Sequence, residues 1–423
     1  MRRTMFCMIF SLFVGGMMAQ PGDNQTTVDV QVRPRAEYRN GALFPRDRGE
    51  LPARFIANRA RLSLGYERSQ LEMRFSAQHV GVWGQDPQID RNGRFILNEA
   101  WAKLRFGHGL FAKLGRQPLS YDDERILGAL DWNMAGRYHD ALKLGYESEQ
   151  DLLHLILAFN QNDERVIGGT YYHPGAQPYK SMQTLWYAHS DEHFRVSALA
   201  MNLGLEGGTA DRAETRYQQT FGVNLGVRPD RALDLSGAFY YQMGRTAADV
   251  SISAWMAALR ANIHATEGLS FQLGSDYLSG DKRESTRFEA FNPLYGTHHK
   301  FYGAMDYFYA SPFANGLNPG LWDNYAGLNV AVTPSLSLGA TGHYFSTTSN
   351  LQSATGQRSK GLGPEVDLQL SWKLMKDVNL MAGYSFMSGT ETMDYVKGGD
   401  HTRWQDWAWL SVNIQTRVFQ AMW

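Results

Sequence analysis

Basic side chains recur at alternate positions over the first third of this chain, and their spacing places them on one face of successive strands. They are Arg33, Arg35, Arg59, Arg61, Arg74, Lys103, Arg105, Lys113 and Lys143. The acidic residues in the same phase are few, namely Glu37, Glu72 and Glu99. Guanidinium groups bind carboxylates bidentately, so a row of them predicts a surface that attracts and passes on anions. The alternative interpretation is an interlocked set of ion pairs that stiffens a wall.

The elements that carry these side chains are strands that alternate apolar and polar residues. The clearest run is 365–374, in which Val366, Leu368, Leu370, Trp372 and Leu374 share one face and polar residues share the other. Apolar residues alternate with the basic ones in the same way at Leu62, Leu64, Met73, Phe75 and elsewhere. A charge that faced lipid would cost about 2–4 kcal/mol at mid-membrane, so we expect the basic residues to point inward. In later strands the inward phase becomes more acidic, with Asp234, Asp276, Glu365 and Asp367.

Repetition of this unit predicts an all-β protein, a transmembrane antiparallel β-barrel of about 18 strands with short periplasmic turns and longer extracellular loops. The expected strands are 28–38, 56–66, 71–80, 96–106, 110–120, 138–146, 152–159, 182–189, 194–203, 217–227, 233–241, 250–263, 269–278, 324–332, 336–345, 365–374, 378–387 and 407–418. The alternation becomes irregular after Val418, so the terminal Trp423 is not assigned to the closing strand.

Composition and the N-terminus agree with this fold class. Mean hydropathy is -0.40, and no apolar run approaches the roughly 20 residues of a spanning helix. A basic start and a short apolar stretch predict a signal peptide at residues 1–19, followed by one barrel domain at 20–423. The mature chain then lacks cysteine, and removal of Arg2 and Arg3 from 41 basic residues leaves 39 against 42 acidic ones, a net charge of -3. We therefore expect no disulfide and no nucleic-acid partner.

The connection from Ser279 to Asp323 is much longer than the others and rich in aromatic residues. Loops of this length are usually functional, and the aromatic density argues against disorder. We expect it to pack into the mouth of the barrel, the alternative being a cap over the outer rim.

The segment from Gly115 to Asp140 resembles the core motif of alginate-export-type outer-membrane proteins. It contains Gly115-Arg116-Gln117, then the run from Tyr121 to Gly128, Asp131-Trp132-Asn133 and the run from Gly136 to Asp140. The segments Phe301–Phe308 and Asp323–Leu328 are also similar to that family's pattern. The resemblance implies an 18-stranded barrel that passes a polysaccharide or related solute, without fixing which. We add Arg116, Arg125 and Arg137 to the expected solute-binding set, and expect this charged segment to fold against the inner wall with its charges paired.

Other chemistry is weakly supported. His139-Asp140 and His298-His299 lack a third partner for catalysis or metal binding and are expected to be hydrogen-bonding residues. The cluster of Asp122, Asp123, Glu124 and Arg125 lacks the spacing of a calcium loop, so ion pairing with Arg116 and Arg137 is preferred. Trp404, Trp407 and Trp409 are interpreted as anchors at the membrane interface.

The sequence thus predicts a bacterial outer-membrane channel for an anionic polysaccharide, oligosaccharide or similar solute, without catalytic residues, metal or cofactor. The alternatives are a general diffusion porin and, with less support, an enzyme built on a barrel. Expected partners are membrane lipid, lipopolysaccharide and the solute, around a monomeric barrel.

Overall fold

The computed structural model describes residues 24–86, 95–164, 166–173, 177–282, 284–353 and 356–423. The predicted signal peptide, residues 1–19, lies outside these described residues. No helix in the described ranges is long and apolar enough to cross a membrane.

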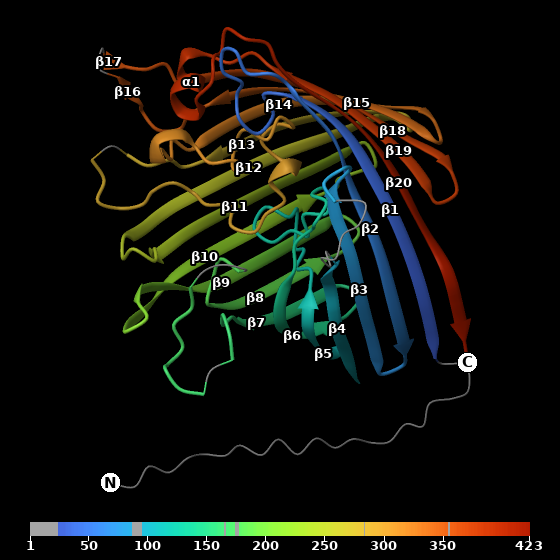
Figure 1. The fold of residues 1–423 in the computed structure, drawn as a ribbon. Coiled ribbons are helices and arrows are strands. Elements are labelled where there is room, and N and C mark those ends of the chain that lie inside the picture. The colour runs from blue at the N-terminus through green and yellow to red at the C-terminus, as the bar shows by residue number, and fades with distance from the viewer. Residues whose placement is uncertain (1–23, 87–94, 165, 174–176, 283, 354–355) are drawn as a thin grey trace, which may run out of the picture.

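Eighteen strands of the described chain form one antiparallel sheet in which each strand pairs with its neighbours in sequence (Figure 1). They are β1 (Gln25–Asn40), β2 (Ala53–Arg68), β3 (Leu71–Val82), β4 (Phe95–Gly107), β5 (Leu110–Gln117), β6 (His139–Glu147), β7 (Asp151–Phe159), β8 (Ser181–Ser190), β9 (Phe194–Thr209), β10 (Arg212–Val227), β11 (Leu233–Arg245), β12 (Ser251–Thr266), β13 (Leu269–Leu278), β14 (Leu321–Thr333), β15 (Leu336–Ser346), β18 (Gly361–Met375), β19 (Val378–Met387) and β20 (Gln405–Met422). Short elements occur in the loops: η1 (His298–Lys300), η2 (Ala314–Gly316), β16 (Gln352–Ser353), β17 (Gly356–Gln357) and α1 (Glu391–Lys397). The predicted strand count and order are confirmed.

The sheet closes into a barrel because β1 pairs with β2 on one side and β20 on the other. The closing pair contains a β-bulge, since Val28 lies opposite Phe419 while Asp29 lies opposite Arg417. Val418 is the extra residue, and both Val418 and Phe419 are therefore exposed on the outside. This bulge explains why the alternation is irregular at that point, although β20 continues to Met422.

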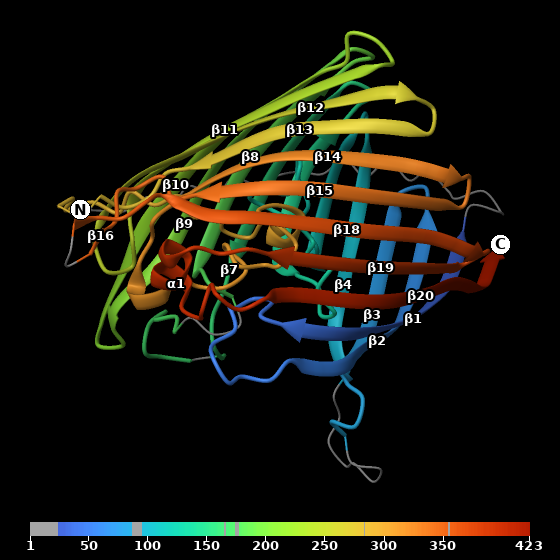
Figure 2. The same cartoon turned by 90° about the horizontal axis from the view of Figure 1, so that it is seen from above.

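Short and long connections separate to opposite ends of the barrel (Figure 2). The eight connections at the end that holds both termini of the barrel have two to five residues each, such as 69–70 and 376–377. The other end carries the long loops, but two of its connections are short, since β11 and β12 are joined by residues 246–250 only. β9 and β10 continue well past the expected ends and are joined by a turn of two residues, so no long loop occurs there.

Two of the long loops turn inward rather than outward and lie within the ring of strands (Figure 1). The first inward loop is residues 118–138, and the second inward loop is residues 279–320. They meet at an isolated parallel bridge between Leu127 and Tyr295, where the Tyr295 N–H donates to the Ile126 carbonyl at 3.0 Å. Phe301, Tyr302 and other apolar side chains of the second loop are buried in one cluster with the first. The expectation that the long loop packs inside the barrel is confirmed.

The last strand corrects the assignment of two tryptophans. Trp407 and Trp409 are only 3% and 7% exposed and share the inward phase, while Ala408 and Leu410 face outward. Trp407 donates through Nε1 to Glu37 at 3.1 Å. Of the three tryptophans interpreted as interface anchors, only Trp404 is exposed, at 53%.

Candidate functional site

The two inward loops narrow the lumen, and we call the part of the lumen that they occupy the constriction. There Asp131 of the first inward loop faces the wall formed by β1 and β2. Its carboxylate lies 2.8 Å from Arg59 Nη1, 3.3 Å from Arg33 Nη1 and 3.9 Å from Arg61 Nη1. Partial loss of water within the lumen would by itself raise the pKa of Asp131, but the hydrogen bond from Arg59 and the charges of all three arginines outweigh that effect and lower it. The carboxylate is therefore ionised, and three cations share it.

A second carboxylate is shared in the same way beside this group. Glu37 accepts from Arg35 Nε and Arg39 Nε, each at 2.8 Å. Together the two clusters place five guanidinium groups, Arg33, Arg35, Arg39, Arg59 and Arg61, against the two carboxylates Glu37 and Asp131. This wall of the constriction, which we call the arginine wall, therefore carries surplus positive charge.

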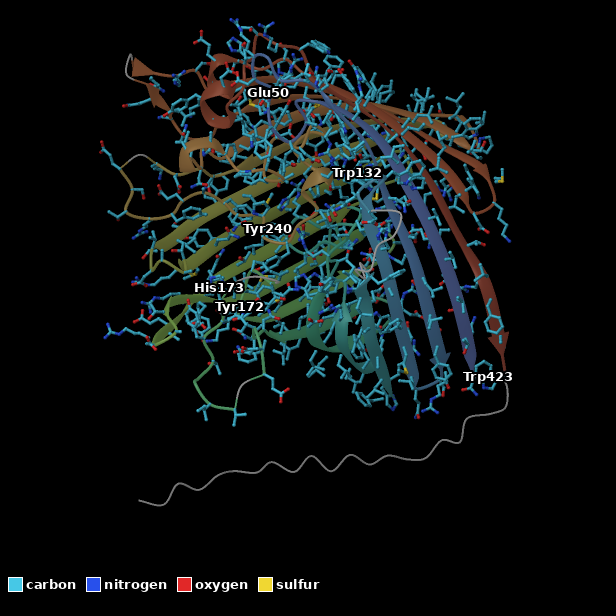
Figure 3. All side chains as sticks on the ribbon, in the orientation of Figure 1. Glu50, Trp132, Tyr172, His173, Tyr240 and Trp423 are labelled. Carbon is cyan, nitrogen blue, oxygen red and sulfur yellow. The ribbon has the colours of Figure 1, made fainter. Side chains whose placement is uncertain are left out.

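Aromatic rings complete the constriction next to the arginine wall. Trp132, labelled inside the barrel in Figure 3, stacks on His299 of the second inward loop with 4.3 Å between ring centroids. The guanidinium carbon of Arg35 lies 4.4 Å from the centroid of the Trp132 ring. The Trp409 ring packs edge-on against Trp132, with 4.7 Å between the ring centroids. Because these residues come from β1, β20 and both loops, Trp132 joins the loops to the wall. Its role was not predicted from the sequence.

Nearer the short turns, three lysines lie directly across from one another on β4, β5 and β6, in the order Lys103, Lys113 and Lys143. Lys103 binds Glu147 at 2.8 Å, but Lys113 and Lys143 have no carboxylate within ion-pair distance among the described residues. Lys113 Nζ lies 3.4 Å from the centroid of the Trp101 ring instead. Because three lysines lie in this row and one carboxylate binds them, the row is a second region of surplus positive charge. Like charges that lie opposite each other on neighbouring strands repel.

The remaining inward residues of the predicted ladder are paired. Arg74 lies 3.3 Å from Glu99 and 3.9 Å from Asp29, and Arg105 contacts Glu72 at 2.6 Å as well as Glu67 at 3.0 Å. At these positions the structure favours the stiffening role over a free anion site.

Arg125 forms a buried charge network. Its Nη1 and Nη2 donate to Asp276 at 2.8 and 2.9 Å, its Nε donates to Asp123 at 2.7 Å, and its guanidinium lies 4.1 Å from the Phe301 ring. The side chains of Arg125 and Asp276 are 2% and 1% exposed. The predicted charge pairing of the loop is thus correct for Arg125, and because two carboxylates bind this guanidinium, it is not available to bind a solute.

The pairing predicted for Arg137 is wrong. No carboxylate binds it among the described residues; Arg137 Nη1 donates to the backbone carbonyls of Tyr295 and, at 2.9 Å, Gly296. The hydrogen-bond partners of the acidic cluster, residues 122–124, also differ from the prediction of ion pairs with Arg116 and Arg137. Asp122 accepts from Trp186 Nε1 and Ser197 Oγ, and Glu124 accepts from Ser120 Oγ.

Arg116 lies outside the path. The inward residues of β5 include Phe111, Lys113 and Gln117, whereas Leu114 and Arg116 alternate outward, as does Asp140 opposite Arg116 on β6. Arg116 and Asp140 form a bidentate pair at 2.9 Å on this outer face. The prediction of Arg116 as a lumen residue is therefore wrong.

The wall formed by β14, β15 and β18 is acidic, as the sequence predicted for Glu365 and Asp367, and it holds the second inward loop. Glu365 accepts from the Met305 N–H at 2.8 Å, and Asp367 accepts from the Ala304 N–H at 3.2 Å. Asp323 lies beside them with its carboxylate 2.9 Å from His343 Nδ1. Arg260 of β12, which the sequence analysis missed, also faces inward and donates to Tyr325 Oη at 3.0 Å. Arg260 alternates with Leu259 in the predicted strand 250–263, and this alternation could have identified Arg260 as an inward residue.

The histidines act as structural hydrogen-bonding residues. His139 Nδ1 lies 2.7 Å from Tyr179 Oη, and His299 Nδ1 lies 2.8 Å from Asp306. Burial, and after it the nearby Arg137, lowers the pKa of His298 to about 4. In the described ranges, the one trio of His and acidic residues with ligand-like spacing is Asp394, Asp400 and His401, on the loop between β19 and β20 and away from the constriction.

Comparison with known families agrees with this geometry. The sequence profile of the alginate export family matches residues 25–401, which is most of the chain. The chain belongs to the alginate export family. Like others in the alginate export family, it is thus a protein of the bacterial outer membrane, in contact with membrane lipid. No curated protein matches it.

Solved structures with a similar fold are also outer-membrane barrels. Acinetobacter baumannii OccAB4 has a TM-score of 0.62 and 12% identity, with coverage of 94% of this chain and 99% of that one. The outer membrane protein opdK from Pseudomonas aeruginosa has a TM-score of 0.61 and 12% identity, with 93% and 99% coverage. A structure of Pseudomonas aeruginosa OpdK with vanillate has a TM-score of 0.59 and 13% identity, with 92% and 98% coverage. At these identities the likeness extends to the fold alone.

Proposed function

We propose that this barrel is a channel that passes an anionic polysaccharide, oligosaccharide or similar solute along its arginine wall. The observation that carries the proposal is the ratio of charges at the constriction, where five guanidinium groups share two carboxylates. Family membership supports a channel, and the surplus charge supports an anionic solute.

The arrangement suits transient binding. Because Asp131 is shared by three arginines, a solute carboxylate can take up a guanidinium donor while Asp131 keeps another. The lysine row on β4, β5 and β6 offers a further cationic station toward the short turns. Weak successive sites let a solute enter and leave, which conduction requires.

A passive pore of this kind needs no cofactor and has no preferred direction. We propose that residues 1–19 are a signal peptide, that 20–423 form one barrel domain, and that the barrel is a monomer surrounded by lipid and lipopolysaccharide. The N- and C-terminal strands of the barrel pair with each other within one chain, which supports the monomer.

A general diffusion porin without solute preference is the second candidate. The pairing of Arg74 with Glu99 and of Arg105 with Glu72 favours it, because paired charges contribute less field to the pore. The two candidates differ in ion selectivity.

Reversal potentials across a salt gradient in planar bilayers test the proposal. The wild-type channel should prefer anions at about 0.1 M salt and lose this preference near 1 M, since the Debye length falls from about 10 Å to about 3 Å. Changing Arg33 and Arg61 together to Gln removes two surplus charges and leaves the Arg59–Asp131 contact intact, so the anion preference should fall.

Arg116→Gln is the matched control, because it removes one positive charge on the outer face of the barrel. It should leave selectivity unchanged. Cation selectivity in the wild type, or an unchanged reversal potential in the double variant, would contradict the anionic-solute proposal and leave the general porin.

A further inference from the structure

A side cavity of about 430 Å³ opens between the two inward loops and the wall formed by β9 and β10. Its walls come from the two inward loops, the loop between β7 and β8, the start of β6, and the inward faces of β9 and β10. Polar lining is supplied by Arg137, His139, Gln177, Gln218 and Asn292, and apolar lining by Pro178, Leu203, Leu205, Leu294 and Tyr295. The solute path proposed above does not use this space.

Among the described residues that line the cavity, Arg137 is the one that carries a full charge. Its Nη1 is bound to the Tyr295 and Gly296 carbonyls, whereas Nε and Nη2 have no hydrogen-bond partner among the described residues. Burial lowers the pKa of Arg137, which means that its surroundings disfavour the cation. Charges in such surroundings are normally paired, so the donors that Arg137 turns toward the cavity are suited to an anion.

Neutral polar groups next to Arg137 add hydrogen-bonding capacity. Gln218 is buried, and its side chain has no hydrogen-bond partner among the described residues. The Asn292 side chain accepts from the Leu294 N–H at 3.0 Å, which leaves its amide N–H groups without a partner in the same described part of the chain. The amide N–H groups of Gln218 and Asn292, together with the guanidinium of Arg137, can donate hydrogen bonds to the two oxygens of one carboxylate.

Size and the apolar lining restrict the rest of the ligand. At roughly 30 Å³ per water the cavity holds about fourteen waters, which leaves room for a body of one ring beyond the carboxylate. Three leucines line it, so that body is apolar. We propose that this cavity binds a small organic carboxylate with an apolar body, held by Arg137.

Occupancy would connect to the constriction through the loops. Arg137 belongs to the first inward loop, and the carbonyls that it binds belong to the second inward loop. A ligand bound to Nε and Nη2 of Arg137 would therefore contact the residue that joins the two loops. The site is independent of the arginine wall, because none of Arg33, Arg35, Arg39, Arg59 and Arg61 lines it.

Benzoate is a suitable probe, and calorimetric titration of the detergent-folded full-length barrel measures its binding. Wild type should bind benzoate at one site. Arg137→Gln should weaken binding about tenfold or more, because it removes a charge-assisted hydrogen bond. Leu205→Trp should weaken it, because the larger ring takes up part of the cavity while Arg137 stays in place. Heat-modifiable gel migration shows whether each variant is folded.

Two controls separate this site from others. Arg231→Gln changes an exposed arginine in the turn between β10 and β11 and should bind benzoate like wild type. The Arg33 and Arg61 double variant should also bind normally, even where its anion selectivity is lost. Absence of binding to wild type, or equal binding by wild type and Leu205→Trp, would overturn the proposal. Equal binding by wild type and Arg137→Gln would overturn the assignment of the carboxylate to Arg137.

Discussion

Arg59 and Asp131 form the contact that fixes the first inward loop to the barrel wall. Arg59 Nη1 lies 2.8 Å from Asp131 Oδ1, and the arginine side chain is 1% exposed whereas the aspartate side chain is 60% exposed. The wall thus supplies a buried cation, and the loop supplies a carboxylate that solvent and solute can reach. This asymmetry makes Asp131 the residue at which a passing anion competes.

Replacing Asp131 by Asn tests this relationship. The change leaves three guanidinium groups without their shared carboxylate, so the anion preference should increase. Because Asp131 is largely exposed, we expect a loss of stability of only about 1–2 kcal/mol, below the 3–5 kcal/mol of a buried pair. Reversal potentials and thermal unfolding in detergent measure the two effects. A decrease in anion preference would show that Asp131 does not compete with solute.

The buried pair of Arg125 and Asp276 should behave differently. Arg125→Met leaves Asp276 as an unpaired carboxylate that is 1% exposed, and should cost about 3–5 kcal/mol of unfolding free energy. The matched double variant with Asp276→Leu removes both charges and should recover much of this loss. Denaturant unfolding measures both, and equal stability of the two variants would argue that Asp276 is reached by water.

Lys397 at the end of α1 predicts a pH dependence in the outer loops. Its Nζ donates to the Pro312 carbonyl at 2.6 Å and to Ser311 Oγ at 2.8 Å, and it meets no carboxylate in the described ranges. Burial lowers the pKa of Lys397 to about 7. The unfolded amine keeps its proton up to about pH 10.4, so the loop junction should gain stability as pH rises from about 7 to 10.4.

Hydrogen exchange of the α1 amides, corrected for the intrinsic effect of pH, measures that junction. The slope should approach at most about 1.4 kcal/mol per pH unit, the limit for one proton. It should vanish in Lys397→Met, and its persistence there would assign the titration to another group. His401→Gln is the control, because it changes a neighbouring group that pairs with Asp394 instead.

The stack of Trp132 on His299 should limit conductance. Trp132→Ala removes a ring that contacts Arg35, His299 and Trp409 together, and so widens the constriction. We expect higher single-channel conductance, with anion preference retained because no charge changes. Unchanged conductance would mean that the narrowest point lies elsewhere in the barrel.

The strands and their two faces were determined by the sequence itself, since a period of two is a local property of the extended backbone. It placed Leu62 and Leu64 outward and Arg59 and Arg61 inward, as the structure has them. Strict alternation after Leu114 also pointed Arg116 outward, and it was the motif resemblance that led to the wrong assignment. Trp407 and Trp409 were ambiguous because both phases of their strand are apolar at that point.

Only the tertiary structure decided which charges meet. Arg137 binds carbonyls of a loop more than 150 positions away, and Arg125 binds Asp276 across the barrel. Such pairs depend on how two long loops pack against each other inside the wall, and no spacing along the chain encodes that packing. The bulge at Val418 is likewise a property of the closing strand pair, because it exists only once β20 lies beside β1. Local alternation therefore set the barrel and its faces, while packing of the loops set the charge balance of the constriction.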